Sequence, residues 1–476
     1  MRGAALRRAA GVFLLLLPLF ASADAWTARA QSRGDWSDPA LIYETVEAID
    51  APYLASDPTG VTHLVWRETQ RDTDAPSTQL EAIFYTNDLD GRMSQGRDIV
   101  AMSGGAVGPI VAGDANGLVH LIWRGSNNTL YHSLAGSASA RSAQGWAAPV
   151  AVSTSNMNAH IMVDDERIAH VVYPGVESSG IYYTRYDAAN DAWMSPVLVS
   201  LTASDEVSPD FTRLAIGPDG TLHLVWTEYL LPDGWPPTGI YYANSTDGGA
   251  TWSRATELAG ADNVQANVAV DSRGFVHVAW NRVVGIGGRY HQYSDDGGRS
   301  WSPVAEVVPA GQGGTEGPPQ LAIDSADTVH MLTTFGGCAH HAQWVDGVWS
   351  EPVCISGRQA MASRYIEQPA LSIANGNQLH AVFWDDRARL WHATMTADAP
   401  FVPPAAPAES APAADSSGVS PNPTAALLPE ASPTFDLGAA PPSVAQVGPA
   451  RALLPAVAAA GALLGLALLI KLARSR

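Results

Sequence analysis

Cysteine is nearly absent from this sequence of 476 residues, which contains two. Two thiols are too few for a small disulfide-rich scaffold or for a structural zinc site, which takes four ligands. Basic residues are also scarce, because 27 Lys and Arg stand against 47 Asp and Glu and give a formal net charge of -20. Nucleic-acid binding rests on Lys and Arg that neutralise phosphates, so we expect no nucleic-acid partner.

Long apolar runs are confined to the two ends of the chain. Arg2, Arg7 and Arg8 precede the apolar run 11–20, and small residues follow at 21–23. This order is typical of a secretory signal. We therefore predict a signal peptide and leader over residues 1–30, with cleavage after Ala23 or after Ala30.

The other apolar run, 452–470, is about as long as the hydrocarbon core of a membrane requires. We predict a transmembrane helix over residues 451–471 and a cytoplasmic basic tail at 472–476. Residues 397–450 are rich in Pro, Ala and Ser, which predicts an extended, disordered stalk. The region 31–396 is therefore expected outside the cell, held by a single-pass anchor in the cell membrane. A wall-sorting signal is the alternative, although the segment 428–432 matches that pattern poorly.

One sequence motif occurs seven times in the region 31–396. It consists of a short apolar strand, a turn, and a His three residues before a large side chain. The copies are His63/Trp66, His120/Trp123, His170/Tyr173, His223/Trp226, His277/Trp280, His330/Thr333 and His380/Phe383. A period near fifty residues built from strands is typical of a β-propeller, in which each small sheet buries its faces against its neighbours. We interpret each His as a structural hydrogen-bonding residue, because equivalent positions in separate blades do not converge on one metal.

The number of blades follows from the outer strands. Six of them begin with an aromatic residue or Met, at Met93, Trp146, Trp193, Trp252, Trp301 and Trp349. A seventh copy lies at the other end of the region, where Trp36-Ser37-Asp38-Pro39 resembles Trp349-Ser350-Glu351-Pro352. We predict an all-β, seven-bladed propeller closed by its N-terminal strand, with six blades as the alternative.

Both cysteines fall in the sixth repeat. Cys338 is expected on its third strand and Cys354 on its outer strand, nearly opposite one another across a tight turn. We predict a disulfide, with two buried free thiols as the alternative. No metal site and no cofactor are predicted, since the adjacent acidic pairs such as Asp385-Asp386 are interpreted mainly as solvated turns, with a calcium site as the alternative.

Two eight-residue segments in consecutive repeats share a Ser-x-Asp-x-Gly-x-Thr/Ser-Trp pattern. Their defining residues are Ser245, Asp247, Gly249 and Trp252 in one and Ser294, Asp296, Gly298 and Trp301 in the other. The Asp accepts hydrogen bonds from the turn, Gly supplies a positive φ and Trp packs between blades. The pattern resembles the Asp-box of bacterial neuraminidase repeats in the sialidase superfamily. That resemblance implies turns between third and fourth strands, on the face opposite the active site.

The other face carries the loops that differ between repeats, at 67–81, 228–239 and 281–289. We predict a binding surface there, since function usually lies on loops held by a rigid scaffold. The first strands also differ at matching places around the centre: Tyr53, Ile110, His160, Arg213, Asn267, Gln320 and Ala370. The candidate ligand-binding residues are Arg67, Arg124, Arg213, Trp235, Arg282 and Arg387. Trp235 is interpreted as a stacking platform or, equally, as a loop anchor.

The resemblance to sialidases also implies an arginine clamp for a sugar carboxylate, a Tyr nucleophile activated by Glu, and an acid/base Asp. The catalytic candidates are Glu228, Asp386 and Tyr229, none of which lies in a recognisable motif. The family's Arg-Ile-Pro signature is absent, and seven blades differ from the six of sialidases. We therefore favour a membrane-tethered extracellular propeller that binds glycans or a protein partner without catalysis. An exo-sialidase or other glycoside hydrolase acting on cell-surface or environmental glycans is the alternative.

Overall fold

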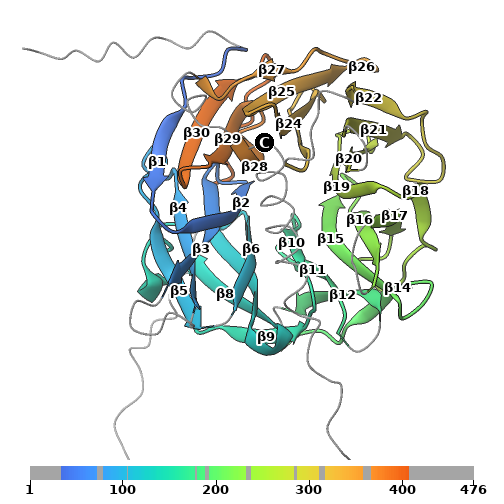
Figure 1. The fold of residues 1–476 in the computed structure, drawn as a ribbon, viewed down its shortest axis with the longest axis horizontal. Coiled ribbons are helices and arrows are strands. Elements are labelled where there is room, and N and C mark those ends of the chain that lie inside the picture. The colour runs from blue at the N-terminus through green and yellow to red at the C-terminus, as the bar shows by residue number, and fades with distance from the viewer. Residues whose placement is uncertain are drawn as a thin grey trace, which may run out of the picture.

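The repeated histidine lies on the second strand of each sheet. The computed structural model describes residues 34–71, 79–103, 105–176, 179–187, 192–231, 237–283, 287–309, 317–357 and 366–406. In these residues, seven antiparallel sheets stand side by side in a ring (Figure 1). The first strands of neighbouring sheets contact one another, so they surround the axis. The predicted all-β, seven-bladed propeller is confirmed, and the six-bladed alternative is wrong.

The first four blades follow the chain in order. Blade one contains β2 (Ala48–Ser56), β3 (Thr62–Arg71), β4 (Gln79–Asn87) and β5 (Arg97–Ser103). Blade two contains β6 (Ala106–Gly113), β7 (Leu118–Gly125), β8 (Thr129–Gly136) and β9 (Val150–Thr154), with short 3-10 helices η1 (Ser126–Asn128) and η2 (Ala143–Gly145). Blade three contains β10 (His160–Val163), β11 (Ala169–Pro174), β12 (Gly180–Asp187), β13 (Ala192–Trp193) and β14 (Val197–Leu201). Blade four contains β15 (Val207–Ile216), β16 (Leu222–Leu230), β17 (Pro237–Ser245) and β18 (Thr256–Ala259).

The remaining three blades complete the ring. Blade five contains β19 (Asn263–Val270), β20 (Val276–Arg282), β21 (Arg289–Ser294) and β22 (Ala305–Val308). Blade six contains β23 (Gln320–Ile323), β24 (Val329–Phe335), β25 (Cys338–Val345), β26 (Val348–Trp349) and β27 (Val353–Cys354). Blade seven contains β28 (Ile366–Ala374), β29 (Gln378–Asp385), β30 (Arg389–Thr396) and, as its outer strand, β1 (Ala40–Glu44) from the other end of the chain.

The N-terminal strand closes the ring, as predicted. Strand β1 pairs antiparallel with β30, and Leu41 lies opposite Trp391. Trp36 forms a further bridge to Met395 and packs on the core of blade seven. The blue and orange strands therefore lie side by side in Figure 1. The sheet that ends the chain thus gains its fourth strand from the start of the chain, which covers an otherwise open edge.

The segment after β30 stays on the ring up to Ala406. Ala397 N donates to Asn377 O at 2.8 Å, Val402 N donates to Asn375 O at 2.8 Å, and Ala405 N donates to Pro58 O at 2.7 Å. The chain thus crosses from blade seven to blade one beyond the predicted boundary at residue 397. The predicted signal segment 1–30, and the stalk from 407 with the apolar run that follows it, lie outside the described residues. No helix in the described part of the chain is long and apolar enough to span a membrane.

Each repeated histidine is bonded to the third strand of its own blade. In blades one, three and four, Nδ1 lies 2.7 Å from a tyrosine Oη, in the pairs His63–Tyr85, His170–Tyr183 and His223–Tyr242. In blades two, five, six and seven, Nδ1 lies 2.9–3.2 Å from Nε2 of a second histidine, in the pairs His120–His132, His277–His291, His330–His341 and His380–His392. The structural interpretation of the repeat is therefore confirmed.

The tryptophan of the repeat fills the space between sheets. Trp66, Trp123, Trp226 and Trp280 are buried, and each stacks on an aromatic ring of the third strand: Phe84, Tyr131, Tyr241 and Tyr290. Such aromatic pairs contribute about 0.5–1.5 kcal/mol beyond the burial of their area. The spacing of three residues in the sequence thus places one hydrogen-bonding residue and one packing residue in each of these four blades.

The Asp-box turns join the third and fourth strands of blades four and five. Asp247 accepts hydrogen bonds from Thr251 N at 2.9 Å and from Ser245 Oγ at 2.8 Å, and Asp296 bonds in the same way to Ser300 and Ser294. The hydroxyls of Thr251 and Ser300 also donate, each at 2.6 Å, and they contribute most to a lowering of the pKa of each Asp to about 2, with the other bonds acting in the same direction. Gly249 and Gly298 adopt positive φ, and each lies against a tyrosine of the preceding blade. Each Asp-box turn therefore packs against the preceding blade and stabilises the contact between the two blades.

Cys338 on β25 and Cys354 on β27 form a disulfide, with their Cα atoms 5.9 Å apart. Strands β25 and β27 are paired, so the bond joins the third and outer strands of blade six. This separation lies in the usual range for a disulfide.

Blade six departs from the repeat at Thr333, where four other blades have tryptophan. Arg289 of blade five fills this region, with Nε donating to Thr333 Oγ1 at 2.7 Å and Nη2 donating to Thr334 O at 2.9 Å. Arg289 has no exposed surface. A buried guanidinium therefore joins blades five and six where an aromatic residue is missing.

Replacing this arginine is expected to weaken the ring strongly. In Arg289→Ala, the buried carbonyl and hydroxyl acceptors lose their donor and a cavity forms, so we expect a loss of about 3 kcal/mol in the free energy of unfolding. Chemical denaturation of the full chain measures this loss. The nearby Arg282→Ala changes an exposed side chain and is expected to shift stability by less than about 0.5 kcal/mol. Equal stability of the two variants would contradict the role of Arg289.

Candidate functional site at the axis of the ring

The first strands carry a β-bulge at the same level in five blades. The pairing register shifts between Asp50 and Tyr53, Val107 and Ile110, Asp210 and Arg213, Val264 and Asn267, and Glu367 and Ala370. The backbone is left-handed there at Phe211, Gln265 and Gln368, with φ of 50°, 57° and 42°. Such strain in residues other than glycine costs about 1–3 kcal/mol and is concentrated at functional sites. Bulges also re-aim the side chains that follow them.

The seven residues expected at matching places around the centre do lie at one level. Each is paired with the residue two positions after the repeated histidine: Tyr53 with Val65, Ile110 with Ile122, His160 with Val172, Arg213 with Val225, Asn267 with Ala279, Gln320 with Leu332 and Ala370 with Val382. Asn267 Nδ2 donates to Gln320 Oε1 at 3.1 Å, which joins blades five and six at this level. This part of the prediction is confirmed.

Tyr53 and His160 meet across blade two. Tyr53 Oη lies 2.9 Å from His160 Nε2, and Leu214 N donates to His160 Nδ1 at 3.3 Å. Because Nδ1 accepts a hydrogen bond, the neutral ring carries its hydrogen on Nε2 and donates it to Tyr53. The hydroxyl hydrogen of Tyr53 is then left for another acceptor. Burial raises the pKa of Tyr53 and holds the pKa of His160 well below its usual value, so both groups are neutral at pH 7.

Asp210 supplies a carboxylate beside this pair. Its side chain accepts hydrogen bonds from Phe211 N at 2.7 Å and from Asn158 N at 3.4 Å. Burial raises its pKa to about 6, although Arg213 and Arg124 oppose the shift. Asp210 therefore lies between an arginine of blade four and an arginine of blade two. The sequence did not indicate Asp210, because its contacts with Asn158 and Arg124 of other blades, next to the shift in pairing register, leave no local pattern.

Arg67 and Arg124 extend the charged group into blades one and two. Arg67 forms ion pairs with Asp50 and with Glu81, the latter at 3.3 Å. Arg124 Nη1 donates to Asn128 Oδ1 at 3.1 Å. Burial lowers the pKa of Arg124 and the positive charge of Arg67 lowers it further, whereas Asp210 and Glu81 raise it. The two guanidinium groups therefore lie within electrostatic reach of one another.

We call the group formed by Tyr53, Arg67, Glu81, Arg124, His160, Asp210 and Arg213 the axial cluster. Three of the six predicted ligand-binding residues belong to it: Arg67, Arg124 and Arg213. Their positive charges face Asp50, Glu81 and Asp210, so the cluster holds acidic and basic groups in similar number. It lies where the second strands end and the first strands begin, on the face opposite the Asp-box turns.

The other predicted ligand-binding residues are not brought to the axial cluster. Arg282 ends β20 in blade five and Arg387 lies in the turn between β29 and β30 of blade seven, and both are exposed. Trp235 lies outside the described residues.

Of the three catalytic candidates, Glu228 and Tyr229 are neighbours on β16, and Asp386 lies apart from them. Glu228 is buried on β16, accepts a hydrogen bond from Trp226 Nε1 at 3.1 Å, and has a pKa raised by burial. The ring of Tyr229 packs near Phe211, and burial raises its pKa well above the usual value. Asp386 is exposed in blade seven, three blades away around the ring. The structure therefore does not bring Glu228 and Asp386 together as two carboxyl groups flanking one bond, which in glycosidases lie about 5–10 Å apart.

A tyrosine–glutamate pair does occur, but at the ring closure. Tyr43 of β1 donates to Glu68 of β3 at 2.6 Å, and the Tyr43 ring packs on Trp66 and Phe84. Burial and the neighbouring Glu68 raise the pKa of Tyr43, which disfavours the phenolate. Because this pair joins the outer strand of blade seven to blade one, we assign it to the closing of the ring.

No family model and no curated protein matches this sequence. Solved structures share its fold at low identity. The BP39L lectin from Burkholderia pseudomallei has a TM-score of 0.55 and 15% identity over 75% of this chain and 99% of that chain. A PL25 ulvan lyase has a TM-score of 0.52 and 13% identity over 76% of this chain and 96% of that chain. The NanB sialidase from Streptococcus pneumoniae is less similar, with a TM-score of 0.43 and 12% identity over 76% of this chain and 71% of that chain. The chain is thus an all-β, seven-bladed propeller whose fold resembles those of a lectin and a polysaccharide lyase.

Proposed function

We propose that this propeller binds acidic glycans at the axial cluster and holds them without cleaving them. The observation that supports this function most directly is the gathering of Arg67, Arg124 and Arg213 from three blades. Arg124 lies within electrostatic reach of Arg67 and Asp210, and Arg213 lies within reach of Asp210, Tyr53 and His160. Guanidinium groups bind carboxylates and sulfates through paired hydrogen bonds, and Tyr and His bond to sugar hydroxyls. The similar fold of a lectin, and of a lyase described bound to -[GlcA(1-4)Rha3S]-, supports a carbohydrate ligand.

The chemistry of the cluster favours binding over catalysis. His160 is buried and Tyr53 is half-buried, and both are neutral at pH 7, so neither supplies a charged nucleophile or base. Glu228 is engaged by Trp226, and Asp386 lies across the ring. An exo-sialidase or other glycoside hydrolase stays the alternative, because its substrates would carry the same groups.

We further propose that the propeller is tethered outside the cell with the axial cluster turned away from the membrane. The segment 397–406 crosses the turns between first and second strands, at Pro58, Asn375 and Asn377. In each antiparallel sheet these turns lie on the same face as the Asp-box turns. The predicted anchor at 451–471 follows this segment in the sequence. The chain would therefore leave the ring toward the membrane from the face opposite the axial cluster.

Replacing the arginines of the axial cluster is expected to weaken binding of an acidic glycan at least about tenfold, the loss of one charged contact. We would titrate the full chain in detergent with hexagalacturonate and with its carboxyl-reduced form, and follow hydrogen exchange of β10. Arg124→Gln and Arg213→Gln should lose affinity for the acidic form, while Arg299→Gln on the opposite face should not. Unfolding temperatures show whether each variant is folded, and Arg124→Lys keeps the charge while losing the paired hydrogen bonds.

Two results would contradict the proposal. Equal affinity of the wild type and of both folded variants for hexagalacturonate would show that the axial cluster does not bind the acidic glycan. Release of dye from a fluorogenic sialoside or aryl glycoside by the wild type, but not by Glu228→Gln, would show that the protein is a glycoside hydrolase.

A further inference from the structure

The turn between the third and fourth strands of blade two differs from the Asp-box turns. Gly136 ends β8 at the position that Ser245 holds in blade four, because each pairs with the first residue of the second strand. Trp146 bridges to Ala135 and lies four residues before β9, just as Trp252 lies four residues before β18. Ten positions separate Gly136 from Trp146, against seven between Ser245 and Trp252. Blade two therefore has a longer turn in place of an Asp-box.

This longer turn is well anchored. Trp146 Nε1 donates to Ala140 O at 2.8 Å, and Ala140 is buried. Ser137 O accepts a hydrogen bond from Asn87 Nδ2 of blade one at 2.8 Å. The turn is thus held from within and by the neighbouring blade, so its outer residues have defined positions.

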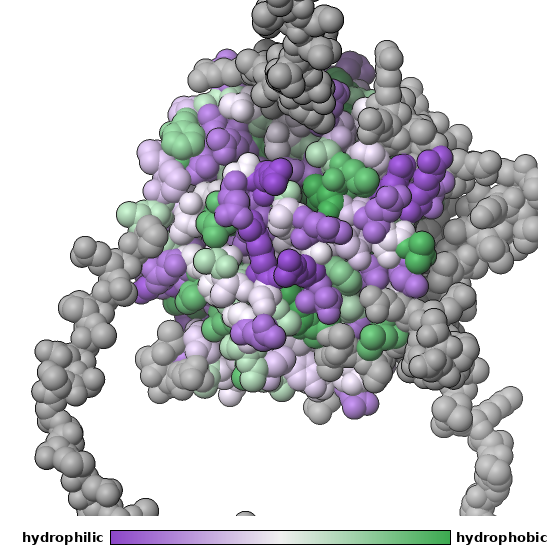
Figure 2. All heavy atoms as spheres, turned by 90° about the vertical axis from the view of Figure 1, so that its left-hand side faces the viewer, coloured by the Kyte–Doolittle hydropathy of each residue, from purple (hydrophilic) through white to green (hydrophobic). Residues whose placement is uncertain are grey.

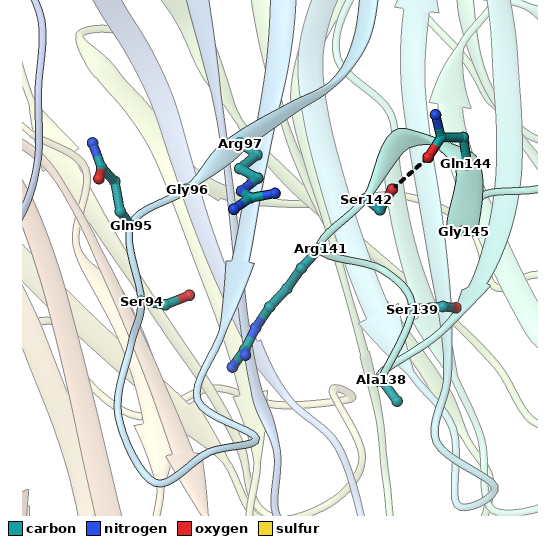
Figure 3. Close-up of a pocket in the computed structure, with 10 residues that line it drawn as sticks. All are labelled: Ser94, Gln95, Gly96, Arg97, Ala138, Ser139, Arg141, Ser142, Gln144 and Gly145. Atoms are coloured by element: carbon teal, nitrogen blue, oxygen red, sulfur yellow. Dashed lines mark hydrogen bonds between the residues drawn. The ribbon is translucent and has the colours of Figure 1, made fainter.

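A groove of about 900 Å³ lies between this turn and the corresponding turn of blade one. Its lining includes hydroxyl, amide and guanidinium groups from Ser94, Gln95, Arg97, Ser139, Arg141 and Gln144. Arg97 and Arg141 both lie in the space between the two loops (Figure 3). This volume is in the range of pockets that hold small ligands.

The two arginines come from different blades and differ in their partners. Arg141 Nη2 donates to Asn87 O at 2.9 Å, and Nη1 pairs with Asp90, so this side chain joins the two turns. Arg97 begins β5 and is exposed, and no ion pair engages it within the described residues. Arg97 is therefore the cation that is available to a ligand, beside a second guanidinium that is held in position.

Gly96 and Gly145 lie in the groove at positions where a larger residue would clash with neighbouring atoms. A Cβ built on Gly96 would lie 1.9 Å from Cη2 of the buried Trp66, and one on Gly145 would lie 2.1 Å from the carbonyl oxygen of Ser139. Neither position accepts a side chain without a shift of these neighbours. The close approach of the backbone leaves the space above it open.

A second hollow, of about 550 Å³, continues from the first. Both are lined by Ser94 and Gln95, and the second extends past Arg92 to Tyr43 and Glu44 of β1. Figure 2 faces the side of the ring where β1, β4 and β5 lie, and hydrophilic side chains gather across it. Arg92, Arg97 and Arg141 thus follow one another along a track over blades seven, one and two, in which apolar side chains such as Leu41 and Ile42 also take part.

We propose that this rim groove is a second glycan-binding site, which takes a chain of acidic sugars along the track. Carboxylate or sulfate groups spaced along such a chain would meet Arg92, Arg97 and Arg141, and its hydroxyls would meet the Ser and Gln side chains between them. The site is separate from the axial cluster, because it lies between turns on the other face. In a protein with a net charge of -20, exposed arginines in one groove select anionic ligands locally, within about a Debye length of 8 Å.

Site-resolved hydrogen exchange of the full chain in detergent tests this site, with hexagalacturonate as the probe. We expect the probe to protect residues 137–146, and Arg97→Glu to weaken that protection at least tenfold in probe concentration. Arg92→Glu should weaken it to a smaller extent. Arg254→Glu is the matched control, since Arg254 is an exposed arginine just before the outer strand of blade four, and it should leave the protection unchanged.

The outcomes separate the two sites. Protection of 137–146 that survives Arg124→Gln but not Arg97→Glu supports the rim groove, whether or not the axial cluster binds. Protection that is unchanged in Arg97→Glu, or absent at millimolar probe in the folded wild type, overturns it. Protection by phosphatidylglycerol vesicles but not by hexagalacturonate would reassign the groove to lipid headgroups and overturn the glycan assignment.

Discussion

Deletion of residues 35–44 is expected to destroy the cooperative fold of the ring. These residues contain β1 and Trp36, which supply the outer strand of blade seven. Trp36 packs on the core of blade seven, and Ile42 and Tyr43 pack on the core between blades seven and one. Burial of each large apolar side chain contributes about 1.5–3 kcal/mol, so their joint loss is comparable with the whole stability of a domain, about 5–15 kcal/mol.

The deletion also opens the edge of β30. Ser37 N donates to Thr394 O at 2.8 Å, and Thr394 N donates to Ser37 Oγ at 3.0 Å, so both groups of Thr394 lose partners. Exposed strand edges pair with other chains, and we therefore expect aggregation in addition to unfolding.

Circular dichroism and analytical ultracentrifugation of the full chain would measure both effects. Deletion of residues 415–424, ten residues of the Pro/Ala/Ser-rich segment, is the control of equal length and should leave the unfolding temperature unchanged. A peptide of residues 34–44 added to the deleted protein should restore part of the fold by strand addition. A monomeric deletion variant with the wild-type unfolding temperature would show that the ring does not depend on this strand.

Acidification from pH 7 to about pH 5 is expected to unfold the propeller. Burial lowers the pKa of His120, His223, His277, His340 and His380 to about 4 and that of His132, His341 and His392 to about 3. In the unfolded chain, histidine has a pKa near 6.5. Between these values the unfolded state binds more protons than the folded state, so stability is lost as the pH falls below 6.5.

The expected effect is large because the histidines act together. Each contributes about 1.4 kcal/mol per pH unit in this window, so several of them exceed the net stability of a domain within one or two units. Asp210, Asp88 and Glu228 act in the opposite direction, since their pKa values are raised in the folded state, which therefore binds their protons more readily than the unfolded state does. Three carboxyl groups against eight histidines reduce the effect without reversing it.

The repeat itself provides the control variant. Blades one, three and four use tyrosine where the other four blades use a second histidine. In His132→Tyr the hydrogen bond to His120 is kept and one titrating group is removed. We expect the pH midpoint of unfolding, followed by tryptophan fluorescence, to fall in this variant. An unfolding free energy that is independent of pH between 7 and 5 would contradict the argument.

Much of the architecture was predictable from local patterns. Seven copies of the repeated histidine, four of them with Trp three residues later, indicated seven blades, because each histidine requires a third strand and each large side chain requires a neighbouring sheet. The similarity of the segments beginning at Trp36 and Trp349 predicted the closing strand for the same reason, since an outer strand has one packing environment in every blade. The Asp-box segments specify their turns almost alone, as their hydrogen bonds join residues at most four positions apart.

The sites depended on contacts that the repeat does not encode. Arg67, Arg124 and Arg213 were among six candidates, and only the ring geometry separated them from Arg282 and Arg387. Asp210 lies in the axial cluster next to a β-bulge that changes the pairing of its strand. Arg97 and Arg141 line one groove because the turn of blade two is longer than the Asp-box turns. Patterns within one blade are determined by interactions between residues close in sequence, so the sequence by itself determined the blade and its number. Which side chains from different blades converge is set by packing across the axis and between neighbouring turns, and that was decided only by the tertiary structure.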